Sequence, residues 1–271
     1  MKTATKLWQD IRECVVRPGT LTVWWLYQAR LVVKTPGGMI AAIDPYLSDA
    51  VALTYGLTRA VPAPLDAAEA EVDLLLATHS HEDHLDPDSV RGFLGHQNTK
   101  FVGPPMAAEK VLGTGVGEDR VVRMRRGDVL EFGDLSVRAV HARHLFAPEP
   151  TPDAVGYVLA VGGLSLYHSG DTEYDSEIVS DIRGVTAAFI SMNGTAGNMN
   201  AHEAAMLAWR AEAKVAVPFH YGLWRDGGYG EGATLDPALF IETHKRLTPE
   251  GRTFVLQPST AVVLDEDGVE S

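Results

Sequence analysis

Short apolar runs of strand length alternate with polar stretches through the first half of the chain. Each run ends at Gly, Pro or Asp, residues that favour turns. This pattern predicts strands at 21–27, 31–34, 39–43 and 72–77, followed by a first helix at 88–94. Asp86 stands where a helix N-cap is expected, with Pro87 directly after it.

The second half alternates strand-like and helix-like segments. We expect strands at 121–124, 129–132, 135–140, 155–161, 164–168, 187–192 and 215–218, with late strands near Phe254 and Val262, and helices at 201–211 and 237–246. Gly162-Gly163 predicts a hairpin turn. Two half-sheets with helices outside predict an α/β fold, a four-layer αββα sandwich, although periodicity alone also permits other α/β arrangements.

The chain shows no sequence repeat and no dividing linker, so we expect one domain over 1–271. Roughly the first 18 residues form an N-terminal extension, and the acidic tail at 265–271 is expected to be a frayed end.

Composition narrows the function classes. Hydrophobic residues make up 45% and charged residues 22% of the chain, which is typical of a globular protein. The net charge of −13 disfavours nucleic acid as a partner, because the average surface repels phosphates. A single cysteine, no secretory leader and no apolar run of about 20 residues favour a cytoplasmic protein that does not enter the membrane.

The densest chemical signal is Thr78-His79-Ser80-His81-Glu82-Asp83-His84, directly after the expected strand at 72–77. Neutral imidazoles bind divalent ions at about 2.0–2.1 Å, and a loop lets two histidines chelate one ion while the next two ligands turn toward another. The alternative is a hydrated polar loop. Three of the ten histidines fall in this segment, which favours the metal site.

His79-x-His81-x-Asp83-His84 resembles the signature of the metallo-β-lactamase superfamily. Upstream, Asp44 after a strand resembles the aspartate that orients the histidine loop as a partner of its ligands, the alternative for that residue alone being a helix or turn cap. Ser169-Gly170-Asp171-Thr172 resembles the motif whose aspartate bridges both metals, and Pro218-Phe219-His220 resembles the final metal-binding histidine.

The third-motif ligand is ambiguous, because Val140-His141-Ala142-Arg143-His144 offers two histidines. We prefer His144, with His141 second. The resemblance then implies two divalent ions: the first held by His79, His81 and His144, the second by Asp83, His84 and His220, and both by Asp171. Asp83, His84 and Asp171 are the residues that it implies for catalysis.

A closer resemblance runs over nearly the whole chain. Its motifs are Pro18-Gly19-Thr20 with Trp24-Trp25-Leu26, the segment from Leu166 to Asp171, and Pro218-Phe219-His220-Tyr221-Gly222-Leu223-Trp224. Together they are similar to the bacterial L-ascorbate-6-phosphate lactonase family. That family implies a cytoplasmic homo-oligomer that opens a sugar-derived lactone, commonly with manganese.

The sequence departs from that family in its shorter length, in two histidines at 141 and 144 where the lactonase segment has aspartates, and in Tyr27-Gln28-Ala29-Arg30 where relatives have a smaller, often glycine-containing turn. These departures leave the substrate open.

Two ions roughly 3.5–4 Å apart activate a water and polarise the substrate. Manganese, zinc or iron would suit these ligands. The leading hypothesis is a hydrolase of a lactone or ester of a small, sugar-like metabolite, phosphorylated or not. A phosphodiesterase or nuclease of the same superfamily, and a metal- or ligand-binding protein without turnover, are the alternatives. Residues next to the motifs that could bind substrate are His141, Arg143, Asn193, Tyr221, Trp224 and Arg225, the arginines being suited to phosphate or carboxylate.

Overall fold

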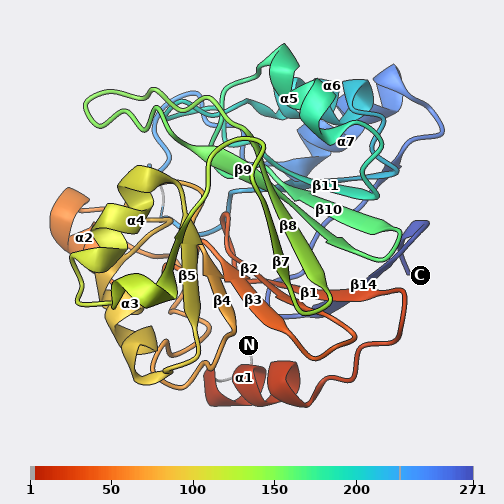
Figure 1. The fold of residues 1–271 in the computed structure, drawn as a ribbon. Coiled ribbons are helices and arrows are strands. Elements are labelled where there is room, and N and C mark those ends of the chain that lie inside the picture. Colours follow the sequence, from red (N-terminus) through yellow and green to blue (C-terminus); the bar gives the residue numbers. More distant parts are fainter. Residues whose placement is uncertain (1–3, 226, 271) are drawn as a thin grey trace.

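The computed structural model describes residues 4–225 and 227–270. In this part of the chain the strands form two mixed sheets that pack against each other (Figure 1). The first sheet has the order β15-β14-β1-β2-β3-β4-β5-β6, and the second β13-β12-β11-β10-β9-β8-β7.

The first sheet is built mostly from the N-terminal half, with two C-terminal strands at one edge. Its strands are β1 (Leu21–Trp25), β2 (Leu31–Lys34), β3 (Ile40–Ile43), β4 (Leu74–Leu76), β5 (Lys100–Gly103), β6 (Val121–Arg123), β14 (Ala261–Asp265) and β15 (Gly268–Val269). The acidic tail, expected to be frayed, therefore forms a hairpin up to 269: β15 pairs with β14, and Val269 is buried because it covers the end of the inter-sheet core.

The second sheet comprises β7 (Val129–Phe132), β8 (Leu135–His141), β9 (Val155–Val161), β10 (Leu164–His168), β11 (Ala187–Ser191), β12 (Val215–Phe219) and β13 (Arg252–Thr253). The predicted turn at Gly162-Gly163 is confirmed, since Val161 pairs with Leu164 across the antiparallel β9–β10 hairpin. The late strand expected near Phe254 ends one residue earlier, at Thr253.

Helices cover the outer face of each sheet. They are α1 (Ala4–Glu13), α2 (Ala50–Tyr55), α3 (Pro87–Gly92), α4 (Pro105–Leu112), α5 (Ser176–Ile182), α6 (Ala201–Arg210) and α7 (Pro237–Leu247), with short 3₁₀ turns η1 (Phe93–Gly95) and η2 (Glu118–Arg120). In Figure 1, α5, α6 and α7 lie beyond the second sheet, whereas α1, α3 and α4 lie on the side of the first.

The alternation of side chains along β1 shows why this layering forms. Val23 and Trp25 belong to the apolar core between the sheets. Trp24 points to the other face and joins the cluster that holds Trp8 and Ile11 of α1. Each sheet therefore buries both faces, and the four-layer αββα sandwich predicted from the sequence is confirmed.

In the described residues, no helix combines the length and apolarity that crossing a bilayer requires.

Candidate metal centre

The histidine loop follows β4 and is held from behind by Asp44, the residue after β3. The backbone of Asp44 is left-handed, with φ at 50°. Its Oδ1 accepts the Thr78 backbone N–H at 2.8 Å, and its Oδ2 accepts both the Thr78 hydroxyl and His84 Nδ1–H at 2.8 Å. Asp44 thus fixes the start and the end of the loop, from the position expected for it.

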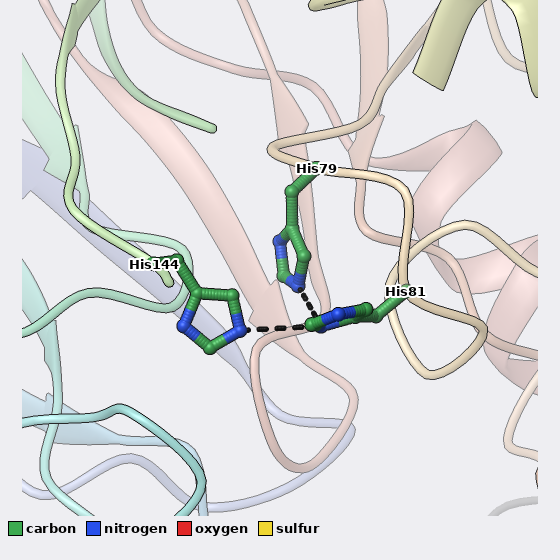
Figure 2. A group of neighbouring side chains, drawn as sticks. All are labelled: His79, His81 and His144. Atoms are coloured by element: carbon green, nitrogen blue, oxygen red, sulfur yellow. Dashed lines mark hydrogen bonds between the residues drawn. The ribbon is translucent and has the colours of Figure 1, made fainter. Parts of the chain in front are cut away.

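Ring nitrogens of His79, His81 and His144 lie close together and form the first group of possible metal ligands (Figure 2). His79 Nε2 lies 3.0 Å and His144 Nε2 lies 3.1 Å from Nδ1 of His81. Ligand atoms bound about 2.0–2.1 Å from one ion stand about 3.0–3.4 Å apart. The spacing of these nitrogens therefore fits a shared metal ion.

Hydrogen bonds on the far side of each ring decide which nitrogen of the three histidines carries the lone pair. The Thr78 hydroxyl donates its only proton to Asp44. Its oxygen therefore accepts a hydrogen bond from Nδ1–H of His79 at 3.0 Å. His81 Nε2–H donates to the Glu149 carbonyl at 2.7 Å, and His144 Nδ1–H donates to the Gly197 carbonyl at 3.3 Å.

Each of these rings therefore turns its unprotonated nitrogen toward the other two. Metal-binding histidines are oriented by partners of this kind, which fix the tautomer and the direction of the lone pair. Three lone pairs facing one another are unfavourable unless a cation lies among them, so the donor set fits a metal ion.

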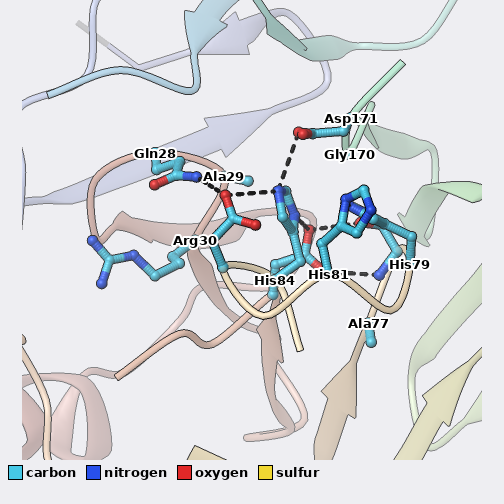
Figure 3. Close-up of polar contacts among 12 residues, drawn as sticks. Gln28, Ala29, Arg30, Ala77, His79, His81, His84, Gly170 and Asp171 are labelled. Carbon is cyan, nitrogen blue, oxygen red and sulfur yellow. Dashed lines mark hydrogen bonds and ion pairs between the residues drawn. The ribbon is translucent and has the colours of Figure 1, made fainter. Parts of the chain in front are cut away.

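The second group comprises Asp83, His84 and His220. His84 Nε2 lies 3.3 Å from His220 Nε2 and 3.8 Å from Asp83 Oδ2. Asp171 lies between the two groups. Its Oδ1 stands 3.2 Å from His84 Nε2 (Figure 3). The same oxygen stands 2.7 Å from His220 Nε2, and Oδ2 stands 3.9 Å from His144 Nε2.

These two groups are the two sets predicted from the sequence, with Asp171 in the linking position. The structure also brings His144, rather than His141, into the cluster. Asp171 Oδ1 is buried and has no hydrogen-bond partner among the described residues, although it faces the two imidazoles at close range. A buried carboxylate oxygen without a hydrogen-bond donor is suited to bind a cation.

The electrostatics of the centre favour neutral rings at His79 and His144 and a charged carboxylate at Asp171. Burial lowers the pKa of His79 well below its ordinary value, and it also lowers the pKa of His144, so both rings are neutral. Burial would raise the pKa of Asp171, but His220 and His84 together hold it well below its ordinary value, so this carboxylate is charged. Burial alone would lower the pKa of His84. The surrounding carboxylates, Asp171 first, instead raise it, so the site favours a positive charge there.

The residues before and after Asp171 place it between the groups. Gly170 has φ at +59°, and a Cβ there would stand 2.7 Å from Cβ of Thr78, so only glycine allows this approach. His168 accepts the Gly170 N–H with Nδ1 and donates Nε2–H to the Ala29 carbonyl at 2.6 Å. The loop that carries Asp171 is therefore fixed to β10 and to the turn at 27–30.

Two positioning residues were not identified from the sequence. Asn198 donates Nδ2–H to Asp171 Oδ2 at 2.9 Å and accepts the Thr172 N–H at 2.9 Å. Gln28, fully buried, donates Nε2–H to Asp83 Oδ2 at 2.5 Å (Figure 3). The unusual turn at 27–30 was the one available signal for Gln28. No pattern in the sequence indicated Asn198.

Two of the substrate candidates, one at the end of β8 and one in the segment after it, lie apart from the cluster. His141 Nε2 lies 3.1 Å from Asp175 Oδ2, beside α5. Arg143 is half exposed and pairs with Glu173 at 3.1 Å. The structure thus engages both in ion pairs outside the candidate metal centre.

The remaining candidates divide between the cavity and its surroundings. A cavity of about 300 Å³ opens beside the centre, and both Asn193 and Trp224 line it. Tyr221 packs its ring against Trp25 at a centroid distance of 5.1 Å and is not among the lining residues. Arg225 is exposed and donates Nε–H to the Arg59 carbonyl.

Comparison with known proteins places this centre in a wider group. Residues 42–221 match the family model described as "Beta-lactamase superfamily domain". The chain is 25% identical over 260 residues to the "Probable L-ascorbate-6-phosphate lactonase" of Escherichia coli O127:H6, an alignment covering 80% of this chain and 73% of that protein.

Solved structures share the fold. A metallo hydrolase from the archaeon Ignicoccus hospitalis superposes with a TM-score of 0.68 at 19% identity, covering 91% of this chain and 99% of that one. CmlA, a diiron beta-hydroxylase from Streptomyces venezuelae, superposes with a TM-score of 0.65 at 16% identity, covering 92% of this chain and 55% of that one.

Proposed function

The chain belongs to the beta-lactamase superfamily domain family, and from that premise we propose that it is a metal-dependent hydrolase of small esters or lactones. The observation that carries the proposal is the orientation of His79, His81 and His144, whose far-side hydrogen bonds direct three lone pairs to one point. The second group and Asp171 extend this set to two sites that share one carboxylate.

Two bound divalent ions would supply an activated water and a Lewis acid for the substrate oxygen. The hydrolysis adds the oxygen of water to the acyl carbon and breaks the bond from that carbon to the alkoxy oxygen, which leaves with a proton. Asp171 and His84, both nearly fully buried, hold fixed positions toward the reacting groups because Asn198 and Asp44 bind their outward atoms. Asp83 is held in the same way by Gln28 and lines the cavity.

A lactone is the favoured substrate form, and the support for it is the similarity to the lactonase of Escherichia coli. That similarity is also the support for a sugar-like metabolite, whereas a homo-oligomer is implied only by the family resemblance of the sequence motifs. Imidazole and carboxylate ligands suit manganese, zinc and iron, and we propose manganese or zinc. The charge of the substrate is a separate question, which the cavity addresses below.

Metal content per chain tests the proposal, with two neighbouring histidines as test and control. Protein purified without chelator should contain about two ions per chain by elemental mass spectrometry. His144→Ala should contain fewer and should lose lactone hydrolysis. His141→Ala, which removes a histidine paired with Asp175 outside the cluster, should retain both ions and activity.

Equal metal loss in both variants would contradict the assignment of His144. A parent protein that binds no metal after reconstitution would overturn the proposal. Cleavage of phosphodiesters but not of esters or lactones would replace the proposed reaction by phosphodiester hydrolysis.

A further inference from the structure

The residues that line the cavity beside the candidate metal centre fall into two chemical groups. One group is His81, His144, Asp171 and His220 of the centre. The other is a set of apolar and aromatic side chains that we call the apolar wall: Val51, Leu57, Phe146, Trp224 and Tyr229. The wall is assembled from segments far apart in the sequence. Ligand cavities of this size and composition bind small molecules largely through apolar contact.

The hydroxyl groups of the two tyrosines at the cavity already have protein partners. Tyr229 accepts the Leu223 backbone N–H with its hydroxyl oxygen at 3.0 Å. The Tyr55 hydroxyl lies 2.9 Å from Glu82 Oε2 and 3.1 Å from Glu149 Oε2. Both tyrosines therefore offer a ligand mainly their rings, which adds to the apolar character of the lining.

The ionisable side chains that line the cavity, apart from histidines, are acidic: Glu82, Asp83, Glu149 and Asp171. None of the lining residues within 4–225 and 227–270 is a lysine or an arginine. Arg143 and Arg225, which the sequence suggested for phosphate binding, pair with Glu173 and with a backbone carbonyl elsewhere. A phosphate attached at a distance from the candidate metal centre would therefore meet Glu82 and Glu149, the two lining carboxylates that are not candidate ligands, and no lysine or arginine.

The other basic groups of this region lie outside the lining of the cavity. Buried Arg30 donates to the carbonyls of Tyr27 and Tyr46, and Arg59 donates to those of Tyr46 and Ser48, while Arg30 Nη2 and Arg59 Nη1 have no hydrogen-bond partner among the described residues. Lys110 binds Glu82 at 2.6 Å. None of these three side chains lines the cavity, so a phosphate bound in it would not contact them in this conformation.

Asn193 is an uncharged polar residue at the cavity. It is 3% exposed, and its Oδ1 is buried without a hydrogen-bond partner among the described residues. A buried amide oxygen without a partner is costly.

We propose that the substrate is an uncharged ester or lactone that carries an aromatic or alkyl group, which packs on the apolar wall. This inference rests on the proposed hydrolase function and specifies its substrate class. It departs from the sugar-like substrate, phosphorylated or not, that the sequence suggested. Phe146, 43% exposed at the cavity, is the wall residue that can be altered with least damage to the core.

Three lactones separate polarity from charge in a kinetic test on the metal-loaded protein. They are γ-phenyl-γ-butyrolactone, gluconolactone and phosphorylated gluconolactone. We expect kcat/KM to be highest for the phenyl lactone and lowest for the phosphorylated one. Phe146→Ala should raise KM for the phenyl lactone about tenfold, because it removes several apolar contacts, and should leave KM for gluconolactone unchanged. Leu145→Ala is the matched control, since Leu145 is 50% exposed and lies outside the lining.

Binding measured by calorimetry distinguishes a wrong substrate class from a wrong reaction. The probes are the γ-lactam of the phenyl compound, which resists hydrolysis, and gluconate phosphate. Lactam binding that weakens in Phe146→Ala but not in Leu145→Ala supports the inference even if no lactone is turned over, an outcome that would count against the proposed function alone. Preference for the phosphorylated probe, absence of lactam binding, or equal effects of the two variants would overturn the inference.

Discussion

Gly170 is a position where one added methyl group should disturb the candidate metal centre through a defined contact. A Cβ at this residue would stand 2.7 Å from Cβ, 2.8 Å from Oγ1 and 2.9 Å from Cγ2 of Thr78. Thr78 donates two hydrogen bonds to Asp44, which in turn holds His84. Gly170→Ala should therefore displace Thr78 from Asp44 and loosen the histidine loop.

Two costs add in this variant, and a second glycine separates them. A left-handed backbone costs a non-glycine residue about 1–2 kcal/mol. Forcing a methyl group into a packed site costs about 1–3 kcal/mol more. Gly162 has nearly the same φ, +57° against +59°, but a Cβ there would meet nothing within 4 Å. We expect a loss in the free energy of unfolding of about 2–5 kcal/mol for Gly170→Ala and about 1–2 kcal/mol for Gly162→Ala.

Urea denaturation followed by circular dichroism gives both free energies, and elemental mass spectrometry gives the metal content of the same samples. Gly170→Ala should bind less metal than the parent, whereas Gly162→Ala should bind the same amount. Equal destabilisation of the two variants, both with full metal content, would refute the argument that contact with Thr78 transmits the damage.

Two further substitutions test the residues that position the ligands. Gln28→Leu removes the donor to Asp83 at similar volume, so affinity for one of the two ions should fall about 10–100-fold while the other ion stays bound. Titration with a competing chelator measures the two affinities, and an equal fall in both would argue against this local role. Asn198→Ala removes the donor to Asp171, which lies between both groups, so both affinities should fall. Loss of a single ion in the Asn198 variant would contradict the linking position of Asp171.

The order of the motifs and their positions at strand ends made most of the candidate ligands predictable from the sequence. The histidine loop could be placed because an apolar strand precedes it, and Asp44, Asp171 and His220 because each follows a strand of its own. Strands that end at the same edge of a sandwich bring such residues together whatever the lengths of the connecting segments. The short strand β5 and the helices α1, α4 and α5 were not predicted, although α1 buries Leu7, Trp8 and Ile11 with helical spacing.

Side-chain direction explains what the sequence left open. His141 ends β8 and points toward Asp175, whereas His144 follows in the irregular segment and turns into the cluster. Trp224 and Arg225 are neighbours in the chain, yet the tryptophan lines the cavity and the arginine is exposed. Proximity to a motif could not distinguish them.

Reaction and substrate choice depend on separate parts of this molecule. The candidate ligands stand at strand ends and are fixed by buried hydrogen bonds such as those of Asp44 and Asn198. The apolar wall comes from α2 and from loops, and none of its members is a candidate metal ligand. Changes in the wall can therefore alter KM without altering metal content, and changes behind the ligands can do the reverse. A fold arranged in this way can change substrate class while it keeps its metal chemistry, which is why distant similarity to a lactonase supports the reaction more strongly than the substrate.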